Sequence, residues 1–311
     1  MHIGLFTDGL AQYDLSGLLV ACQELGIKGV ELGSGNWSSA PHMMLEELLS
    51  DESSVCAFKE KFARSKVQID ALNCSGNVLD PTYGEEHRIV AEKTFQLAEK
   101  LGVQTVVMTS GLPAGGPHDK CPNWITTHWP PENYDMLDYQ WNTIAIPIWK
   151  KLTNAARSHG VRVAFELHGA SLVYNLQTFE RLCEGVGNCK DILGINMDPS
   201  HSMWMGGDAR EVVRAVPESI FHVHLKDVVP NKHKCMLNGV LDYKPGADQE
   251  ARSWNFDIPG AGNGQEWWED FVAALHEAKY DGILSIELED YTGKPRESIA
   301  RAIKNMQPLI K

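Results

Sequence analysis

Residues 152–169 read LTNAARSHGVRVAFELHG. An amphipathic stretch runs to His159, Gly160 follows it, and a short apolar run rich in β-branched residues covers Arg162–Leu167. Glycine just after such a stretch supplies the left-handed residue that ends a helix. A short apolar run bounded in this way is typical of a buried strand. Residues 152–169 therefore predict a helix, a turn and a strand in succession.

The same alternation recurs along the whole chain, and glycine follows two further helix-like stretches at Gly26 and Gly102. Helices are clearest at Glu85–Leu101, Asp138–His159, Glu266–Ala278 and Pro295–Ile310. We expect eight strands, at Ile3–Thr7, Gly29–Leu32, Gln68–Cys74, Thr105–Thr109, Arg162–Leu167, Leu193–Met197, Ile220–Leu225 and Gly282–Leu288. Strands that alternate with helices form parallel sheets with crossover helices.

Eight such units predict a closed (β/α)8 TIM barrel, in the α/β class. A doubly wound open sheet usually carries fewer strands and often has a Gly-rich loop after the first, and no such loop follows Phe6. The sequence GAGNG at 260–264 resembles a nucleotide-binding loop, but no predicted strand precedes it, so we interpret it as a turn.

The 311 residues fit one barrel, so we expect a single domain over residues 1–311. Two connections, at about 111–138 and 228–265, are too long for simple turns, and each follows a predicted strand. Loops in this position lie on the catalytic face of a barrel, where long ordered loops act as lids or substrate walls. The alternative is an unstructured insertion.

Composition excludes several classes of protein. The 28 Lys and Arg against 41 Asp and Glu give a net charge of −13, which would repel a nucleic acid backbone. The seven cysteines are scattered, without a Cys-x-x-Cys pair, so neither a disulfide framework nor a zinc knuckle is indicated. The chain has no run of about 18 apolar residues and no signal-like start. We expect a cytoplasmic protein without a membrane partner.

Candidate metal ligands stand at the ends of the last four predicted strands, in AFELHG (164–169), NMDPSH (196–201), FHVHLKD (221–227) and SIELED (285–290). Alternate residues of a strand face the same side, so Glu166, Asp198, His224 and Glu287 should converge at the barrel mouth. His222 shares a face with His224, but His224 lies nearer the strand end. Three carboxylates and one imidazole suit Mn²⁺ first, with Mg²⁺, Co²⁺ or Zn²⁺ as alternatives.

Other polar and aromatic residues flank these ligands. His168, Lys226 and Asp227 lie just beyond them, where a general acid, a stabilising ammonium and an orienting carboxylate could act; structural ion pairs are the alternative. His201 follows Asp198 by three residues and could contact substrate or metal-bound water; the alternative is a capping role or a contact with a ligand side chain. Trp124 and Trp129 lie in the first long connection and could form substrate walls.

These motifs resemble those of the sugar-phosphate isomerase/epimerase superfamily, the xylose-isomerase-like TIM barrels, over essentially the whole chain. The resemblance rests on the ligand quartet, the Asp198–His201 spacing and the run AKYDGILSIELED. The runs PNWITTHWPPE and HVHLKD resemble the branch of keto-sugar and inosose isomerases and epimerases and the metal-binding subunits of C-glycoside deglycosidases.

The resemblance implies a metal-dependent isomerase or epimerase that acts on a ketose or keto-sugar through an enediolate. Glu166 and Glu287 would be both ligands and the proton-transfer pair, while His201, His168 and Arg252 would contact hydroxyl groups. The alternative is a metal-bearing lyase subunit of the deglycosidase type, which needs a small partner subunit. A homo-oligomer is also possible.

Two other functions are weaker. Endonucleases of the superfamily bind three zinc ions through extra histidines at the ends of strands three and four, but here these ends read NCSG and MTSG. The other of the two, a non-catalytic sugar-binding barrel, would not need two carboxylates placed for proton transfer about a metal.

Overall fold

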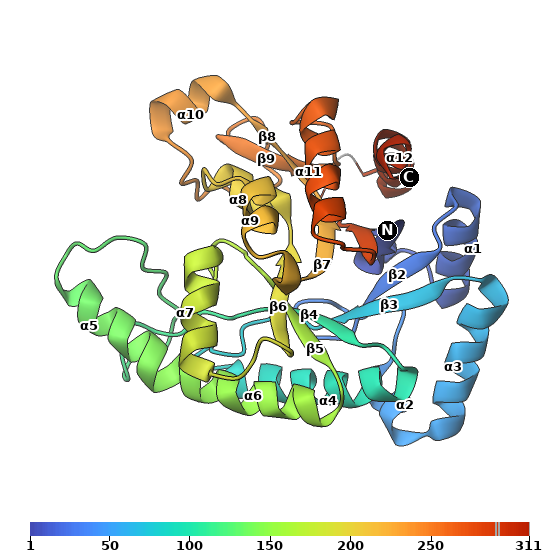
Figure 1. The fold of residues 1–311 in the computed structure, drawn as a ribbon, viewed down its shortest axis with the longest axis horizontal. Helices are drawn as coiled ribbons and strands as arrows, with labels where there is room; N and C mark the ends of the chain where they lie inside the picture. Colours follow the sequence, from blue (N-terminus) through green and yellow to red (C-terminus); the bar gives the residue numbers. More distant parts are fainter. Residues whose placement is uncertain (290, 292, 311) are drawn as a thin grey trace.

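The computed structural model describes residues 1–289, 291 and 293–310. Eight parallel strands close into a barrel in the order β1-β10-β7-β6-β5-β4-β3-β2 (Figure 1). They are β1 (His2–Phe6), β2 (Gly29–Gly33), β3 (Gln68–Asn73), β4 (Thr105–Thr109), β5 (Arg162–Glu166), β6 (Leu193–Met197), β7 (Ile220–Leu225) and β10 (Ile283–Ile286). Each overlaps a predicted strand, and the predicted barrel is confirmed.

Helices connect the strands and surround them. The α-helices are α1 (Leu15–Leu25), α2 (Leu45–Ser50), α3 (Glu52–Ser65), α4 (Gly84–Leu101), α5 (Glu132–Asp138), α6 (Ile146–Ser158), α7 (Leu176–Val186), α8 (Pro199–Trp204), α9 (Ala209–Ala215), α10 (Lys232–Asn238), α11 (Gln265–Glu277) and α12 (Pro295–Met306). Gly26 and Gly102 end α1 and α4 with φ of 73° and 76°, as the glycine pattern predicts. Within the described residues, no helix combines the length and apolar character needed to cross a membrane.

The inside of the barrel is packed with side chains of unequal size. Ala71, Val107, Ala164 and Phe221 form a buried cluster contributed by β3, β4, β5 and β7. Gly194 in β6 makes room for the aromatic ring, because a Cβ atom there would lie 2.3 Å from Phe221 Cδ2. This part of the barrel is therefore a packed support, and active sites of such barrels lie at the carboxyl ends of the strands.

The helical run predicted at Asp138–His159 begins earlier and is not uniform. It starts at Glu132 with α5, passes through a π-helical segment, η2 (Tyr139–Ala145), and continues as α6. Pro147, at the start of α6, lacks the N–H that a regular helix would use there. Within η2, buried Gln140 donates to the carbonyl oxygens of Pro113 and Asn123, which ties the preceding connection to the helix.

The second long connection is folded. It contains β8 (Asp227–Pro230), α10 and β9 (Trp254–Asp257), and β8 pairs with β9 as an antiparallel hairpin. In Figure 1 this hairpin and α10 project together beyond the barrel strands. The alternative of an unstructured insertion is therefore wrong for this connection.

Asp227 anchors the GAGNG segment, which forms a turn as predicted. Its Oδ2 atom accepts hydrogen bonds of 3.0 Å from the backbone N–H groups of Gly260, Gly262 and Asn263, and one of 3.3 Å from the indole of Trp268. Oδ1 accepts from the Val228 N–H and the Asn263 side chain. We therefore correct the expected substrate-binding role of Asp227: its oxygens are committed to the turn.

Asp227→Asn should lower the free energy of unfolding by about 3 kcal/mol, because an amide has one acceptor oxygen for donors that now share two charged ones. Thermal and urea denaturation would measure the loss. Asp257→Asn is the matched control, since Asp257 pairs with Asp227 across the hairpin and, among the described residues, its carboxylate accepts from Ile258 N–H alone. Equal stability of the two variants would contradict the anchoring role.

Candidate metal centre and active site

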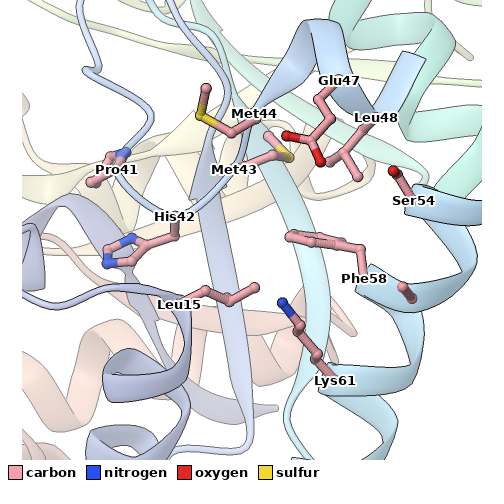
Figure 2. Close-up of a pocket in the computed structure, with 11 residues that line it drawn as sticks. Leu15, Pro41, His42, Met43, Met44, Glu47, Leu48, Ser54, Phe58 and Lys61 are labelled. Atoms are coloured by element: carbon pink, nitrogen blue, oxygen red, sulfur yellow. The ribbon is translucent and has the colours of Figure 1, made fainter. Parts of the chain in front are cut away.

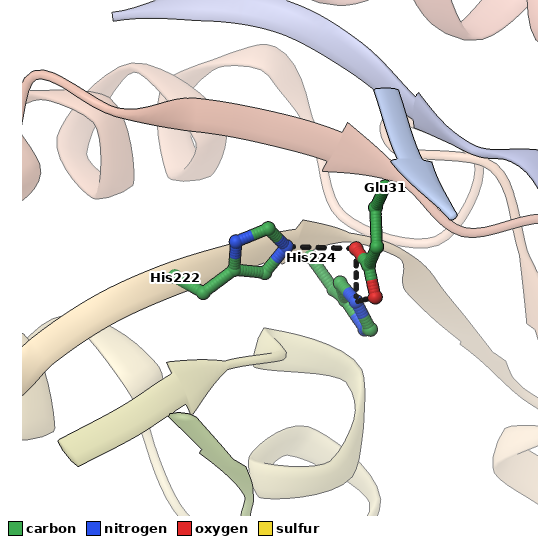
Figure 3. Close-up of side chains that lie close together, drawn as sticks. All are labelled: Glu31, His222 and His224. Atoms are coloured by element: carbon green, nitrogen blue, oxygen red, sulfur yellow. Dashed lines mark hydrogen bonds and ion pairs between the residues drawn. The ribbon is translucent and has the colours of Figure 1, made fainter. Parts of the chain in front are cut away.

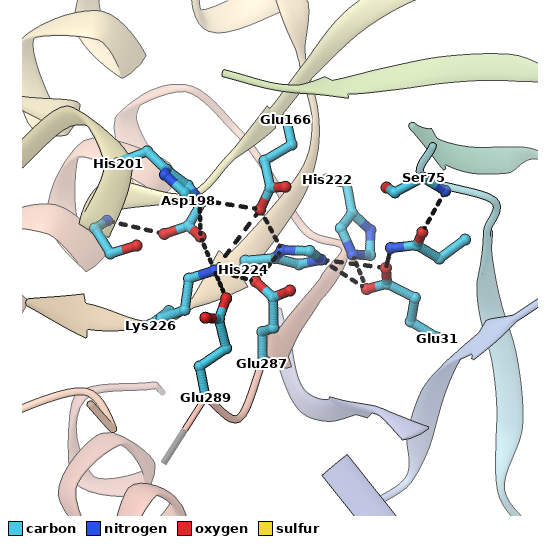
Figure 4. Close-up of polar contacts among 12 residues, drawn as sticks. Glu31, Ser75, Glu166, Asp198, His201, His222, His224, Lys226, Glu287 and Glu289 are labelled. Carbon is cyan, nitrogen blue, oxygen red and sulfur yellow. Dashed lines mark hydrogen bonds and ion pairs between the residues drawn. The ribbon is translucent and has the colours of Figure 1, made fainter. Parts of the chain in front are cut away.

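The four predicted ligands converge at the carboxyl end of the barrel (Figure 4). Glu166 ends β5, Asp198 is the N-cap of α8 directly after β6, His224 lies in β7, and Glu287 follows β10. One ligand atom from each lies within 4.8 Å of the other three. His224 Nδ1 is 3.2 Å from Glu166 Oε1 and 3.0 Å from Glu287 Oε2. This set matches the predicted quartet residue for residue.

Lys226 extends its ammonium group into the middle of these carboxylates. Its Nζ atom lies 2.6 Å from Glu287 Oε2, 3.0 Å from Asp198 Oδ2, 3.0 Å from Glu289 Oε1 and 4.0 Å from Glu166 Oε1. The side chain is 1% exposed. A buried cation at this point shows that the site attracts positive charge, which burial of several carboxylates requires.

Burial and neighbouring charges act in opposite directions on the pKa values here. Burial raises the pKa of Asp198 to about 7, against the lowering effect of Lys226. Burial would also raise the pKa of Glu287, but the charges of Lys226 and His224 bring it far below its usual value. Conversely, burial lowers the pKa of Lys226, yet Asp198, Glu287 and Glu289 raise it well above its usual value. The nearby cations thus stabilise the charged form of Glu287, whereas burial disfavours the charged form of Asp198.

The residues present fit a divalent metal ion. The donor set is oxygen-rich with one imidazole, as Mn²⁺, Mg²⁺, Co²⁺ and catalytic Zn²⁺ accept. Among the described side chains, buried Asp198 Oδ2 makes no hydrogen bond of normal geometry despite its ion pair with Lys226. A carboxylate oxygen left in this way retains a lone pair for a metal.

His201 and His168 lie against each other beside the ligands, with ring centroids 4.1 Å apart and the ring planes tilted by 47°. His201 Nδ1 accepts from the indole N–H of Trp204 at 3.3 Å, so its Nε2 carries the proton in the neutral ring. That Nε2 lies 3.6 Å from Asp198 Oδ2 and 3.8 Å from Glu166 Oε1. Burial lowers the pKa of His201 well below its usual value. His201 is therefore a neutral donor that faces the ligand oxygens.

A cavity of about 200 Å³ opens over this site. Glu166, Glu287, Glu289 and His168 form one side of it, and the rest is lined by Phe6, Asp8, Trp37, Ser38, Asn73, Ser75 and Thr109. Carboxylate, amide and hydroxyl groups of this density suit a small ligand that carries several hydroxyl groups. The predicted site residue His168 thus lines the cavity together with both members of the glutamate pair.

Aromatic side chains close one flank of the site. Phe256, from β9, lies with its ring 4.7 Å from Lys226 Nζ and 5.1 Å from the His201 ring. Trp204 stacks on Trp254 at 4.9 Å and meets the edge of Trp124 at 6.4 Å. Neither Phe256 nor Trp204 was predicted from the sequence as a site residue. Trp204 follows His201 by three residues, one helical turn, which is a signal that could have indicated it.

Two predicted substrate contacts do not reach the cavity. Trp129 is 70% exposed in the connection before α5 and is absent from the lining. Buried Arg252 stacks its guanidinium 4.7 Å over the Trp254 ring and is also absent from the lining. His201 and Lys226 are absent from this lining as well, so the substrate contacts of Trp129 and Arg252 stay predictions.

Two other cavities lack the group of carboxylates that lines the cavity over the candidate metal site. One of about 310 Å³ lies between α1, α2 and α3 and is lined mainly by apolar groups such as Met43, Leu48 and Phe58 (Figure 2). Another, of about 430 Å³, lies between the first long connection and α7. Among the residues that line them, the first holds one carboxylate, Glu47, and the second none.

Comparisons with known proteins identify the family. The model of the xylose isomerase-like TIM barrel family matches residues 19–309, and the chain belongs to that family. The uncharacterised protein YfiH of Bacillus subtilis (strain 168) is 40% identical to it over 100% of this chain and 99% of that protein. The inosose dehydratase of Clostridium perfringens (strain 13 / Type A) is 25% identical over 156 residues, half of each chain.

Solved structures support the same fold. The IolI protein with a bound zinc atom superposes with a TM-score of 0.68 at 18% identity, covering 100% of this chain and 98% of that one. The structure of L-ribulose 3-epimerase gives a TM-score of 0.65 at 14% identity, covering 99% and 94%. The predicted membership of the xylose-isomerase-like TIM barrels is confirmed.

Proposed function

We propose that this protein is a divalent-metal-dependent isomerase or epimerase that moves a proton next to the carbonyl group of a keto-sugar or a cyclic polyol ketone. One observation carries the proposal: the carboxylates of Glu166 and Glu287 approach the same nitrogen, His224 Nδ1, at 3.2 and 3.0 Å from strands on different sides of the barrel mouth. A substrate in the adjoining cavity would lie against both carboxylates.

Glu166, Asp198, His224 and Glu287 would hold the metal, with Mn²⁺ as our first expectation. When bound, it supplies Lewis acidity that polarises a carbonyl oxygen. One glutamate removes the proton beside the carbonyl and the other returns a proton to the same or the neighbouring carbon. Lys226 stabilises the negative charge of the enediolate, and His201 and His168 donate to substrate hydroxyl groups.

A second candidate reaction is elimination, in which the same enediolate expels a substituent from the β-carbon. The relatives named inosose dehydratase, 25% identical over half the chain, favour it. The Lys226 ammonium, 3.0 Å from Glu289, would then give a proton to the leaving hydroxyl group. A deglycosidase-type subunit that needs a small partner protein is a variant of this candidate. The net charge of −13 argues against a nuclease.

The test is deuterium incorporation from D₂O into ketohexoses, 3-keto-sugars and inososes, followed by mass spectrometry and proton NMR. The protein is loaded with Zn²⁺ or Mg²⁺ for NMR, because paramagnetic Mn²⁺ broadens the signals. We expect exchange at the carbon beside the carbonyl. As the control, a chelator that removes the metal should abolish this exchange. Exchange of hydrogen for deuterium with retention of all carbon and oxygen atoms supports isomerisation or epimerisation, whereas loss of water supports elimination. Metal-loaded protein that exchanges no substrate would contradict both reactions for the chain alone.

A further inference from the structure

Glu31, in β2, is a fully buried carboxylate that the proposed reaction does not use (Figure 3). His222 Nε2 donates to its Oε2 at 2.7 Å, and His224 Nε2 lies 3.0 Å from Oε2 and 3.2 Å from Oε1. A buried carboxylate thus faces two imidazole rings in the barrel interior.

Glu31 is itself held in place from a third side. Asn73 Nδ2 donates to Glu31 Oε1 at 2.7 Å, and Asn73 Oδ1 accepts from the Ser75 backbone N–H at 2.8 Å. The strand register between β2 and β3 shifts between Val30 and Glu31, an irregularity of the kind that redirects side chains near sites. The carboxylate therefore has a fixed position and accepts three donors, as Figure 4 shows.

The two nitrogens of His224 consequently face different partners. Nε2 points to Glu31, and Nδ1 points to Glu166 and Glu287. A carboxylate that accepts the Nε2–H of an imidazole leaves the lone pair of Nδ1 free for a metal and fixes the orientation of the ring. One ligand atom from each of Glu31, His222 and His224 also lies within 4.8 Å of the other two, so the alternative to hydrogen bonding is a second ion held by this group, and the experiment below distinguishes the two.

We propose that Glu31 is a positioning residue for the metal centre: it holds His224 with Nδ1 directed at the other three ligands, while His222 and Asn73 hold Glu31. The inference rests on the proposed metal-dependent function. An amide in place of the carboxylate cannot reproduce the arrangement, because three donors would compete for one acceptor oxygen and the new NH₂ group would face another donor.

The test compares Glu31→Gln with Asp70→Asn. Asp70 also pairs with a histidine, His2 Nε2 at 3.1 Å, but it lies in the first half of β3, toward the other end of the barrel. Isothermal titration with Zn²⁺ should show metal binding about 10- to 100-fold weaker in Glu31→Gln and unchanged in Asp70→Asn. The visible absorption bands of the Co²⁺-loaded protein should shift in Glu31→Gln alone. Thermal denaturation of the metal-free variants separates general loss of stability from these effects.

Each outcome has one meaning. Wild-type protein that binds no divalent metal at this site would overturn the proposed function. Wild-type protein that binds metal, with unaltered affinity and Co²⁺ absorption in Glu31→Gln, would overturn only the positioning role. Two ions per wild-type chain, reduced to one in Glu31→Gln, would also overturn it, because Glu31 would then be the ligand of a second metal.

Discussion

Glu287→Gln should reduce the rate of deuterium exchange at least about a thousandfold, near the upper end of the effect of a positioned proton-transfer group. The glutamine keeps the shape of the side chain but cannot accept a proton, and it offers Lys226 Nζ a neutral oxygen in place of the charged one that now lies 2.6 Å away. Metal binding should weaken as well, because one of three carboxylate ligands is lost. Single-turnover exchange at saturating metal separates the two effects.

Glu289→Gln is the control for this prediction. Glu289 lies two residues later, lines the same cavity and pairs with Lys226 at 3.0 Å, but its side chain is 38% exposed and it is not part of the ligand group. We expect its exchange rate to stay within about tenfold of the wild-type rate, as for a group outside the proton transfer. Full exchange by metal-loaded Glu287→Gln would refute the assignment of Glu287 to the proton-transfer pair.

The fold was predictable because local patterns and global architecture agree in this chain. Short β-branched runs, glycine-terminated helices and a strict alternation of the two leave few topologies other than a barrel. The ends of the helices were harder to predict from the sequence. The helix predicted to begin at Asp138 begins at Glu132 and contains the π-helical segment Tyr139–Ala145. Sequence periodicity does not report such a segment, because tertiary contacts of Gln140 and the ring of Pro147 accompany it.

The metal quartet was predictable for a related reason. Parallel strands of a barrel bring their carboxyl ends together, so residues far apart in sequence meet whenever each stands at a strand end. Glu31 escaped prediction because it lies in β2, inside a five-residue run, GVELG, that reads as a buried strand. Phe256 escaped because the hairpin that carries it is an insertion, and nothing in its sequence fixes where the hairpin folds back.

The wrong prediction of a substrate-binding role for Asp227 also has a physical explanation. Asp227 directly follows Lys226, and sequence position alone cannot tell which of the two side chains joins the carboxylates of the metal site. The structure separates them: Lys226 points to four carboxylates, whereas Asp227 accepts hydrogen bonds from the GAGNG turn more than thirty residues later. Side chains of neighbouring residues diverge in extended backbone, and the distant turn decides which of them becomes structural.

Lys226→Met should separate the structural and chemical roles of the buried ammonium. The substitution leaves Asp198 and Glu287 without their cation, so the metal-free protein should lose about 3–5 kcal/mol of stability, the usual cost of breaking a buried ion pair. Metal binding should restore much of this loss, since an ion that binds only the folded state stabilises it by mass action. Denaturation with and without Zn²⁺ measures both quantities.

Exchange by the metal-loaded Lys226→Met protein should nevertheless fall about a hundredfold in kcat with a smaller change in KM, because a charge that stabilises the enediolate acts mainly in the transition state. Lys244→Met is the matched control: Lys244 also pairs with a carboxylate, Asp242 at 2.8 Å, but does so within the second long connection. Unchanged turnover in Lys226→Met would assign this lysine to charge compensation alone. The enediolate would then depend on the metal and the histidines for stabilisation, and the elimination reaction would lose its proposed proton donor.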